Sequence, residues 1–390
     1  MANSNKKVFY CSSIRKCELN SYLGSLIHTF LKKNGYSLIT KSSQSDYIII
    51  NTCGVDQTRE DMALSLIQYY CNKYLVKKQL IICGCLPEIN PSLNQSEDIR
   101  KKLILIGPKE LYRFNEIFTP QISIEKVANN LIDKKLCNKN GFKEDGYYIL
   151  ISQGCMSNCA YCSIKKAKGD VTSKPLLQVL KEFKAGLKLG FKYFILLGDD
   201  CGSYGMDIGI DLAELLNAIG QIKGDYQISI HYFEPHRLEI LFPKIKRDIF
   251  RKIYALNIPI QSMNQRIIKL MNRKYNLESI LFIAKKIKEV SPSIILKTHI
   301  IYCYPTETKK EFLNNINHPG LEEYSQVHYY CFSLRKGTSA AKLKYGISRG
   351  ERKSKIETIK KISCQKNNYF FPYGDKLEVE GLNFGKPLNI

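Results

Sequence analysis

The sequence lacks long apolar stretches. No run of about 18 apolar residues occurs in the 390-residue chain, so we expect no membrane-spanning helix and no membrane partner. The first seven residues are polar and no apolar signal-peptide core follows them, so we expect a cytoplasmic protein. In the reducing cytosol, the 14 cysteines indicate metal binding or catalysis rather than disulfide bonds.

Acidic residues are scarce relative to basic ones. The chain has 36 Asp and Glu against 59 Lys and Arg, a formal net charge of +23. This excess favours a polyanionic partner such as RNA or a ribosomal surface. The chain is also rich in Lys, Ile and Asn, as an AT-rich genome would produce, and its lysines are spread along the whole sequence. A compositional origin therefore explains the charge equally well.

The chain also lacks internal repeats and low-complexity segments, and its length allows two or three domains. We expect an α/β domain over 1–132, because buried strand-like runs alternate with helical patterns. This alternation predicts a doubly wound parallel sheet. The strands are expected near 8–10, 47–51 and 80–83, with helices near 18–34 and 56–77. Residues 133–145 are rich in Lys and Asn and read as a linker.

The second section, 146–345, contains six strand-like runs separated by helical stretches. The alternation predicts a partial (β/α)6 TIM-like barrel. The runs are 147–152, 192–197, 226–232, 256–261, 294–301 and 326–332. The last section, 346–390, is expected to form a charged helix near 350–364 and a short tail with one strand-like piece at 376–380.

Three cysteines carry most of the functional information. Cys155, Cys159 and Cys162 form a CxxxCxxC motif directly after the strand predicted at 147–152. Thiolates are the usual ligands of iron–sulfur clusters. Three of them can hold a 4Fe–4S cubane whose fourth iron stays open to a small molecule. A structural zinc site is the main alternative, but it usually has paired CxxC elements or a Cys/His set, and no histidine lies near this loop.

The loop resembles the cluster loop of radical S-adenosylmethionine (SAM) enzymes, in which the open iron chelates SAM. The resemblance implies that Cys155, Cys159 and Cys162 are the catalytic cluster ligands. It also implies that Tyr161, directly before the last cysteine, lies near the adenine of SAM.

Three further cysteines follow strands of the predicted N-terminal sheet or precede its first helix. They are Cys17, Cys53 and Cys85, in the runs KCELN, NTCGV and CGCLPE. The carboxyl ends of neighbouring parallel strands meet at one crevice, so the three thiols can converge. Each alone would be read as an inert buried cysteine. As a set, they indicate a second cluster, with Cys83 as an alternative third ligand.

These runs, with PIQS at 259–262, MNRKY at 271–275, YPTET at 304–308 and SLRKGT at 333–338, resemble the radical SAM methylthiotransferases in sequence and order. That family modifies tRNA or a ribosomal protein. The resemblance implies two 4Fe–4S clusters, SAM, and an electron donor such as flavodoxin or ferredoxin. The run GDDCGSYGMD at 198–207 looks more like the ribosomal-protein branch.

One departure from the family bears on the substrate. Relatives usually end in a small β-barrel called TRAM, and here the tail could hold only a remnant. We therefore expect a less enclosed substrate cleft, and a peptide or protein loop as the target in slight preference to tRNA.

Polar residues after the predicted barrel strands are candidates for contacting SAM or substrate. A carboxylate at this position commonly contacts the amino group of SAM in radical SAM proteins, and the alternative is a helix N-cap. Arg335 can bind a carboxylate or phosphate, or form a surface ion pair. His299 lies within a strand and is read as a core histidine. The candidates are Asp199, Asp200, Glu234, His236, Gln261, Ser262 and Arg335.

We therefore expect an enzyme, a radical SAM methylthiotransferase that inserts sulfur into an unactivated C–H bond. One alternative is a radical SAM enzyme with another outcome, such as plain sulfur insertion or oxidation on a peptide. The other is a non-catalytic, cluster-stabilised protein that binds RNA or the ribosome. The remaining cysteines are read as buried structural thiols, of which Cys201, at a strand end, is the one that could have a role.

Overall fold

The computed structural model describes residues 6–14, 17–132, 146–344, 346–365, 369–371, 377–380 and 382–384. The chain divides into two compact units. The first comprises 1–144, 166–169 and 374–389, and the second comprises 145–165 and 170–373. The predicted linker at 133–145 lies outside the described residues.

The first unit contains a five-stranded parallel sheet in the order β2-β1-β3-β4-β5. This is the doubly wound arrangement that the sequence predicts, with the strand order reversing between β1 and β3. The strands are β1 (Lys7–Ser12), β2 (Ser37–Ile39), β3 (Tyr47–Thr52), β4 (Gln79–Gly84) and β5 (Ile104–Ile106). The helices are α1 (Glu18–Lys33), α2 (Gln57–Tyr74), α3 (Leu86–Ile89), α4 (Glu97–Lys101) and α5 (Phe114–Phe118).

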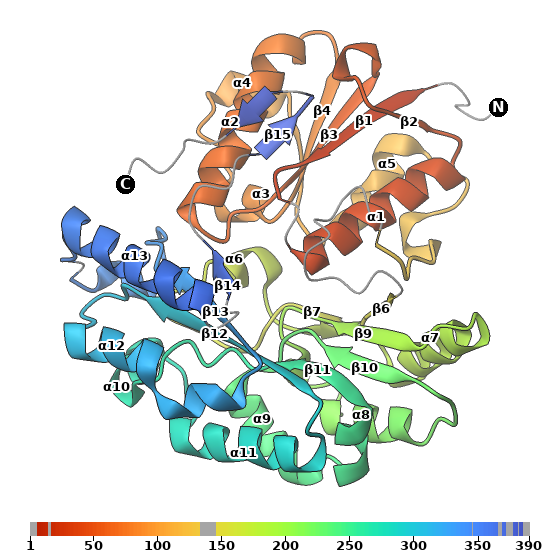
Figure 1. The fold of residues 1–390 in the computed structure, drawn as a ribbon. Helices are drawn as coiled ribbons and strands as arrows, with labels where there is room; N and C mark the ends of the chain where they lie inside the picture. The colour runs from red at the N-terminus through yellow and green to blue at the C-terminus, as the bar shows by residue number, and fades with distance from the viewer. Residues whose placement is uncertain are drawn as a thin grey trace. The chain divides into compact units, whose positions relative to one another are not determined.

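Both faces of this sheet are covered by helices (Figure 1). Successive side chains of a strand point to opposite faces. Ile48 and Ile50 of β3 pack in one cluster with Leu66 of α2. Ile49 packs in the other cluster with Phe30 of α1. Burial on both faces explains why the central strands are continuous runs of Ile and Leu.

The second unit contains a seven-stranded parallel sheet in the order β14-β13-β12-β11-β10-β9-β6. The six predicted strands are present, and a seventh, β14, pairs with β13. One prediction is shifted, because β11 ends at Asn257 and the PIQS run follows it as a loop. The strands are β6 (Gly146–Leu150), β9 (Tyr193–Leu197), β10 (Gln227–Ile230), β11 (Ile253–Asn257), β12 (Ile295–Tyr302), β13 (Gln326–Cys331) and β14 (Tyr369–Phe371).

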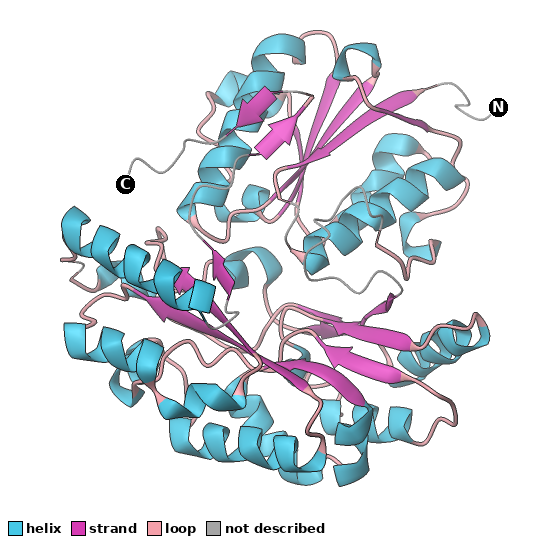
Figure 2. Ribbon diagram, viewed as in Figure 1, coloured by secondary structure: helices cyan, strands magenta, loops and turns pink. Residues whose placement is uncertain are grey.

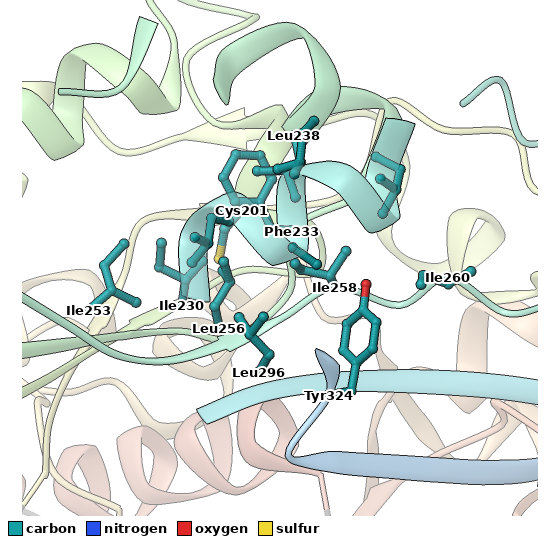
Figure 3. Packing of buried hydrophobic residues seen from close by; sticks show 14 of the residues in the cluster. Cys201, Ile230, Phe233, Leu238, Ile253, Leu256, Ile258, Ile260, Leu296 and Tyr324 are labelled. Atoms are coloured by element: carbon teal, nitrogen blue, oxygen red, sulfur yellow. The ribbon is translucent and has the colours of Figure 1, made fainter. Parts of the chain in front are cut away.

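Helices pack on one face of this sheet (Figure 2). We call this the helix-packed face, and the opposite face the inner face. Figure 3 shows part of the helix-packed core, where Leu238 of α9 lies near Ile230 and Leu256 of the strands. A short antiparallel pair, β7 (Ser152–Gln153) with β8 (Thr172–Ser173), flanks the first strand. The helices are α7 (Leu176–Lys188), α8 (Leu212–Gly220), α9 (Pro235–Leu241), α10 (Gln265–Leu270), α11 (Leu277–Val290), α12 (Lys309–Asn317) and α13 (Arg349–Gln365). A further short helix, α6 (Ile164–Lys168), is not part of this core, and its residues 166–168 belong to the first unit.

The tail forms more structure than the sequence predicts. Strands β15 (Leu377–Val379) and β16 (Leu382–Phe384) pair as an antiparallel hairpin that belongs to the first unit. Val379 is buried in the α2 cluster. Glu380 accepts hydrogen bonds from the backbone and hydroxyl of Ser42, at 2.6 and 2.7 Å, and from Tyr70 at 2.8 Å. Among the described residues, no helix is long and apolar enough to span a bilayer.

Candidate functional site: two sets of cysteines at strand ends

The CxxxCxxC loop lies at the carboxyl end of β6, as the sequence predicts. Its three cysteines are half-buried and form no disulfide. The loop backbone is fixed at several points. Gly154 N–H donates to Asp199 at 2.8 Å, and Ala160 N–H donates to the Met271 carbonyl at 2.9 Å. The Asn272 side chain donates to the Asn158 carbonyl at 2.7 Å, so the thiols are presented on a rigid loop.

The loop thiols lie close enough to influence one another. Burial, with the charge of Asp200 and then that of Cys159, raises the pKa of Cys155 to about 12. Burial and then Cys159 raise the pKa of Cys162 to about 11. Within the described ranges, no three His, Cys, Asp or Glu side chains lie close enough to hold a single metal ion. The all-thiol donor set of the loop suits iron–sulfur chemistry, since each sulfur ligand of a cubane binds a different iron.

Arg273 links this loop to the acidic residues of the sheet, and the sequence interpretation did not select it. Its Nη1 donates to the Cys159 sulfur at 3.4 Å and to the Tyr161 hydroxyl at 3.2 Å. Its Nη2 donates to the Pro259 carbonyl at 3.0 Å and pairs with Glu234 at 3.0 Å. The available signal was its place in the MNRKY run. No local pattern could indicate that Arg273 contacts a cysteine that lies 114 residues earlier in the chain.

The predicted SAM-contacting acids have distinct surroundings. Asp199 is half-buried and holds the backbone of the cluster loop. Asp200 is buried and accepts hydrogen bonds from the N–H groups of Gly202 and Glu234, at 2.9 and 3.1 Å. Burial and then the Glu234 charge raise the pKa of Asp200 to about 6. Glu234 caps α9 by accepting from the Arg237 N–H at 3.0 Å. Within the chain, both side chains therefore act as helix N-caps, Asp200 for the short helical turn at Cys201–Ser203 and Glu234 for α9. This is the alternative role that the sequence left open for them.

The remaining candidates follow β10, β11 and β13. Gln261 is buried and has a positive φ of 77°, a strained conformation outside glycine that marks the loop after β11. Ser262 is fully buried and donates to Asn315 at 3.0 Å. Arg335 is buried rather than at the surface. His236 has Nδ1 3.9 Å from a Glu239 carboxylate oxygen.

The N-terminal cysteines also lie at the carboxyl edge of their sheet. Cys17 is the N-cap of α1, Cys53 follows β3, and Cys85 precedes α3. Burial, followed by the charges of Cys85 and Cys17, raises the pKa of Cys53. The thiols of Cys17 and Cys85 therefore lie close enough to Cys53 for their charges to affect its pKa.

Backbone and amide contacts hold this set of loops. Asn20 and Asn51 donate to each other's side-chain oxygens at 3.1 and 3.0 Å. The Cys85 N–H donates to the Thr52 carbonyl at 3.1 Å. Gly84, at φ 98°, leaves room for this approach, because a Cβ there would lie 2.3 Å from the Thr52 oxygen. The loops that carry Cys53 and Cys85 are thus joined directly.

Two other cysteines are placed in apolar cores. Cys83 packs with Ile81 and Ile106, and burial raises its pKa to about 12. Cys201 is fully buried near Phe233 (Figure 3), and burial, as the leading cause, raises its pKa to about 12. These surroundings are those of inert structural thiols.

Comparisons with known proteins agree with this geometry. The Radical SAM superfamily matches residues 149–318, and the Uncharacterized protein family UPF0004 matches residues 14–105. The threonylcarbamoyladenosine tRNA methylthiotransferase MtaB of Thermotoga maritima is 27% identical, over 88% of this chain and 79% of its own. The tRNA-2-methylthio-N(6)-dimethylallyladenosine synthase of Acetivibrio thermocellus is 28% identical, over 97% and 82%. The ribosomal protein uS12 methylthiotransferase RimO of Chlamydia abortus is 26% identical, over 95% and 82%.

Among solved structures, the radical SAM methyltransferase TsrM of Kitasatospora setae, with cobalamin and a [4Fe-4S] cluster bound, has a TM-score of 0.58 at 10% identity. The match covers 87% of this chain and 74% of that one, and it shows the fold. The two family matches follow one another along the chain, and the methylthiotransferase relatives align with most of the chain, including both matched regions. This favours an enzyme over a non-catalytic binding protein. SAM and two 4Fe–4S clusters are the cofactors that this combination implies. With a cysteine set at the strand ends of each matched region, the chain belongs to the radical SAM methylthiotransferases.

Proposed function

We propose that Cys155, Cys159 and Cys162 hold the SAM-cleaving cluster and that Cys17, Cys53 and Cys85 hold the second cluster. When bound, the clusters and SAM supply the radical that removes a substrate hydrogen and the methylthio group that replaces it. The observation that carries the assignment is the pair of three-cysteine sets, each at the carboxyl edge of a parallel sheet. Three thiols in each set leave one iron open for a small ligand.

The chain's own residues position and shield this chemistry. Arg273 fixes Tyr161 and the Cys159 thiol against Glu234. We propose that Asp199 and Gln261 lie beside bound SAM, and that Asp200 and Glu234 set the shape and charge of the same site. Arg335 would hold an anionic group of SAM or substrate. Tyr161 would pack against the adenine.

The relatives' names specify tRNA or ribosomal protein as substrates, and we propose a macromolecule of one of these classes for this chain. A cytoplasmic flavodoxin or ferredoxin would supply the electron. The sulfur-inserting reaction is tested by mass spectrometry of bulk tRNA and ribosomal proteins, from cells with and without the gene. A methylthio group that disappears on deletion supports the proposal. Sulfur insertion without the methyl group would support the alternative radical SAM outcome instead.

A further inference from the structure

The turn that ends α10 fixes the position of Arg273. Asn272 has a positive φ of 55°, a conformation that asparagine adopts more readily than most residues. Its N–H donates to the Lys269 carbonyl at 2.9 Å, and the Arg273 N–H donates to the Ile268 carbonyl at 3.1 Å. These two bonds form the Schellman arrangement, which commonly ends a helix. The backbone of Arg273 is therefore held by the helix end itself.

Three successive residues of this turn contact the CxxxCxxC loop, and Arg273 is the one that reaches a thiol. The Met271 carbonyl and the Asn272 side chain hold the loop by its backbone. Arg273 differs from them, because its Nη1 donates to the Cys159 sulfur at 3.4 Å. The loop is thus anchored without Arg273, and the contact with sulfur is an additional feature.

The guanidinium is buried, and its charge is only partly compensated. Arg273 is 7% exposed. Its Nη2 lies 3.0 Å from Glu234, which also accepts the N–H of Arg237. The Arg273 Nε atom is buried and has no hydrogen-bond partner within the described ranges. A guanidinium stays protonated in proteins. A positive charge therefore lies in hydrogen-bond contact with a loop sulfur, in surroundings where charges interact more strongly than in water.

Other charged side chains at the loop act differently. Asp199 binds its backbone, and Asp200 is close enough for its charge to act on Cys155. Lys165 is a second cation, but it donates to the Cys155 carbonyl and pairs with an exposed aspartate. Its side chain is 27% exposed, so dissolved ions screen it more than a buried group. Among the described residues, Arg273 is therefore the cation that contacts a thiol of the loop.

The charge beside a cluster sulfur affects how readily the cluster accepts an electron. Reduction makes a cluster more negative, so a nearby cation or an N–H···S hydrogen bond stabilises the reduced form and raises the reduction potential. A nearby carboxylate has the opposite effect. Arg273 and Glu234 should therefore shift the potential in opposite directions, and Arg273 is the one in contact with the sulfur.

We propose that Arg273 sets the reduction potential of the cluster held by Cys155, Cys159 and Cys162, and that Glu234 moderates its effect. Arg273 raises the potential, which favours transfer of one electron to the cluster from a reduced flavoprotein or iron–sulfur protein. The planar guanidinium suits this position, because Nη1 reaches the sulfur while Nη2 reaches the carboxylate, a fork that a lysine ammonium lacks. This inference rests on the proposed function.

The test uses the reconstituted full chain under anaerobic conditions. The midpoint potential is measured by redox titration followed by electron paramagnetic resonance, and the signal that is lost in Cys159→Ala identifies the cluster of the loop. The variants are Arg273→Met, Arg273→Lys and Glu234→Gln. Arg266→Met is the matched control, because it removes a positive charge from a half-exposed side chain of the same unit. Iron analysis identifies any variant that does not hold the cluster.

We expect Arg273→Met to lower the midpoint potential by about 59 mV, a tenfold smaller ratio of reduced to oxidised cluster at a fixed donor potential. Arg273→Lys keeps the charge but not the fork, and its potential should lie between those of Arg273→Met and the wild type. Glu234→Gln should raise the potential, because the amide keeps an acceptor oxygen for Arg273 but carries no charge. Arg266→Met should match the wild type.

The opposite signs separate a charge effect from a structural one. Unchanged potentials in Arg273→Met and Glu234→Gln, both with full iron content, would overturn the inference and leave the proposed function intact. A potential lowered in both variants would also overturn it, because disturbance of the loop would then be the cause. If Arg273→Met holds no cluster, Glu234→Gln and Arg273→Lys decide the question. A Cys159→Ala variant that keeps every cluster signal would remove the proposed cluster assignment, and the inference with it.

Discussion

The guanidinium of Arg273 lies 3.4 Å from the Cys159 sulfur and 3.0 Å from a Glu234 carboxylate oxygen. Both charged side chains are at least nine-tenths buried. Removing one partner of a buried pair leaves the other charge without compensation. The same arginine therefore supports the fold and positions the cluster loop.

Arg273→Met should destabilise the second unit by about 3–5 kcal/mol, the usual cost of leaving a buried charge unpaired. The Arg273→Met/Glu234→Gln double variant should recover part of that loss, because the stranded carboxylate is gone. Urea unfolding of the cluster-free protein measures both. Arg266→Met is the control, since its pair with Glu311 is half-exposed on the arginine side and should cost below about 1 kcal/mol. Equal losses for Arg266→Met and Arg273→Met would contradict the argument.

Cys159→Ala should abolish reductive cleavage of SAM to 5′-deoxyadenosine, because the loop would then have only two of its three thiols. The measurement is product formation by anaerobic protein reduced with dithionite. Cys201→Ala, at a fully buried thiol outside both sets, is the control and should retain the activity. Cleavage by Cys159→Ala at the wild-type rate would show that the loop is not the cluster site.

The Cys17/Cys53/Cys85 triple alanine variant should bind about half of the iron of the wild type, about four atoms rather than eight. It should still cleave SAM but transfer no methylthio group, because the two cysteine sets belong to different sheets. Iron analysis and product assays after full reconstitution give the result. A fully reconstituted wild type with only about four irons would argue against a second cluster.

Much of the scaffold could be predicted from local pattern, because β3, β4 and the strands of the second sheet are buried apolar runs bounded by helices. The three-residue strands β2 and β5 were too short to stand out. Contacts between residues far apart in the sequence could not be predicted, because no local pattern of residues encodes them. Arg273 meets Cys159 across 114 positions, and Glu380 meets Tyr70 across 310. The stacking of His299 on His328 is likewise visible only once β12 and β13 are placed side by side.

Glu380→Ala should release the β15–β16 hairpin from the first unit. The carboxylate accepts from two groups of Ser42 and from Tyr70, and such charge-assisted bonds together should contribute about 1–2 kcal/mol at this exposed site. Faster amide hydrogen exchange in 377–384 measures the release. Glu357→Ala, which removes an exposed pair with Lys360, is the control. Unchanged exchange in Glu380→Ala would show that Val379 burial alone holds the hairpin.

Two histidines of the second unit, His299 on β12 and His328 on β13, should make the unit less stable in acid. The pKa of His328 is about 4 in the folded protein, against about 6.5 for an unperturbed histidine, and that of His299 is shifted in the same direction. As the pH falls below about 6.5, the unfolded chain therefore takes up protons that the folded chain excludes, and stability is lost until the pH reaches about 4.

Asp200 acts in the opposite sense. Its folded pKa of about 6 lies above the unfolded value of about 3.9, so the folded state binds that proton first and gains stability over part of the same range. The pKa of Glu307 is raised as that of Asp200 is, and the pKa of His318 is lowered as those of His299 and His328 are. Three histidines with lowered pKa values outweigh two carboxyls with raised ones, so the urea midpoint of the cluster-free protein should fall between pH 7 and 5. In His328→Asn the fall should be shallower, because one of the excluded protons is gone. Identical pH profiles for wild type and His328→Asn would mean that His328 titrates normally despite its partial burial.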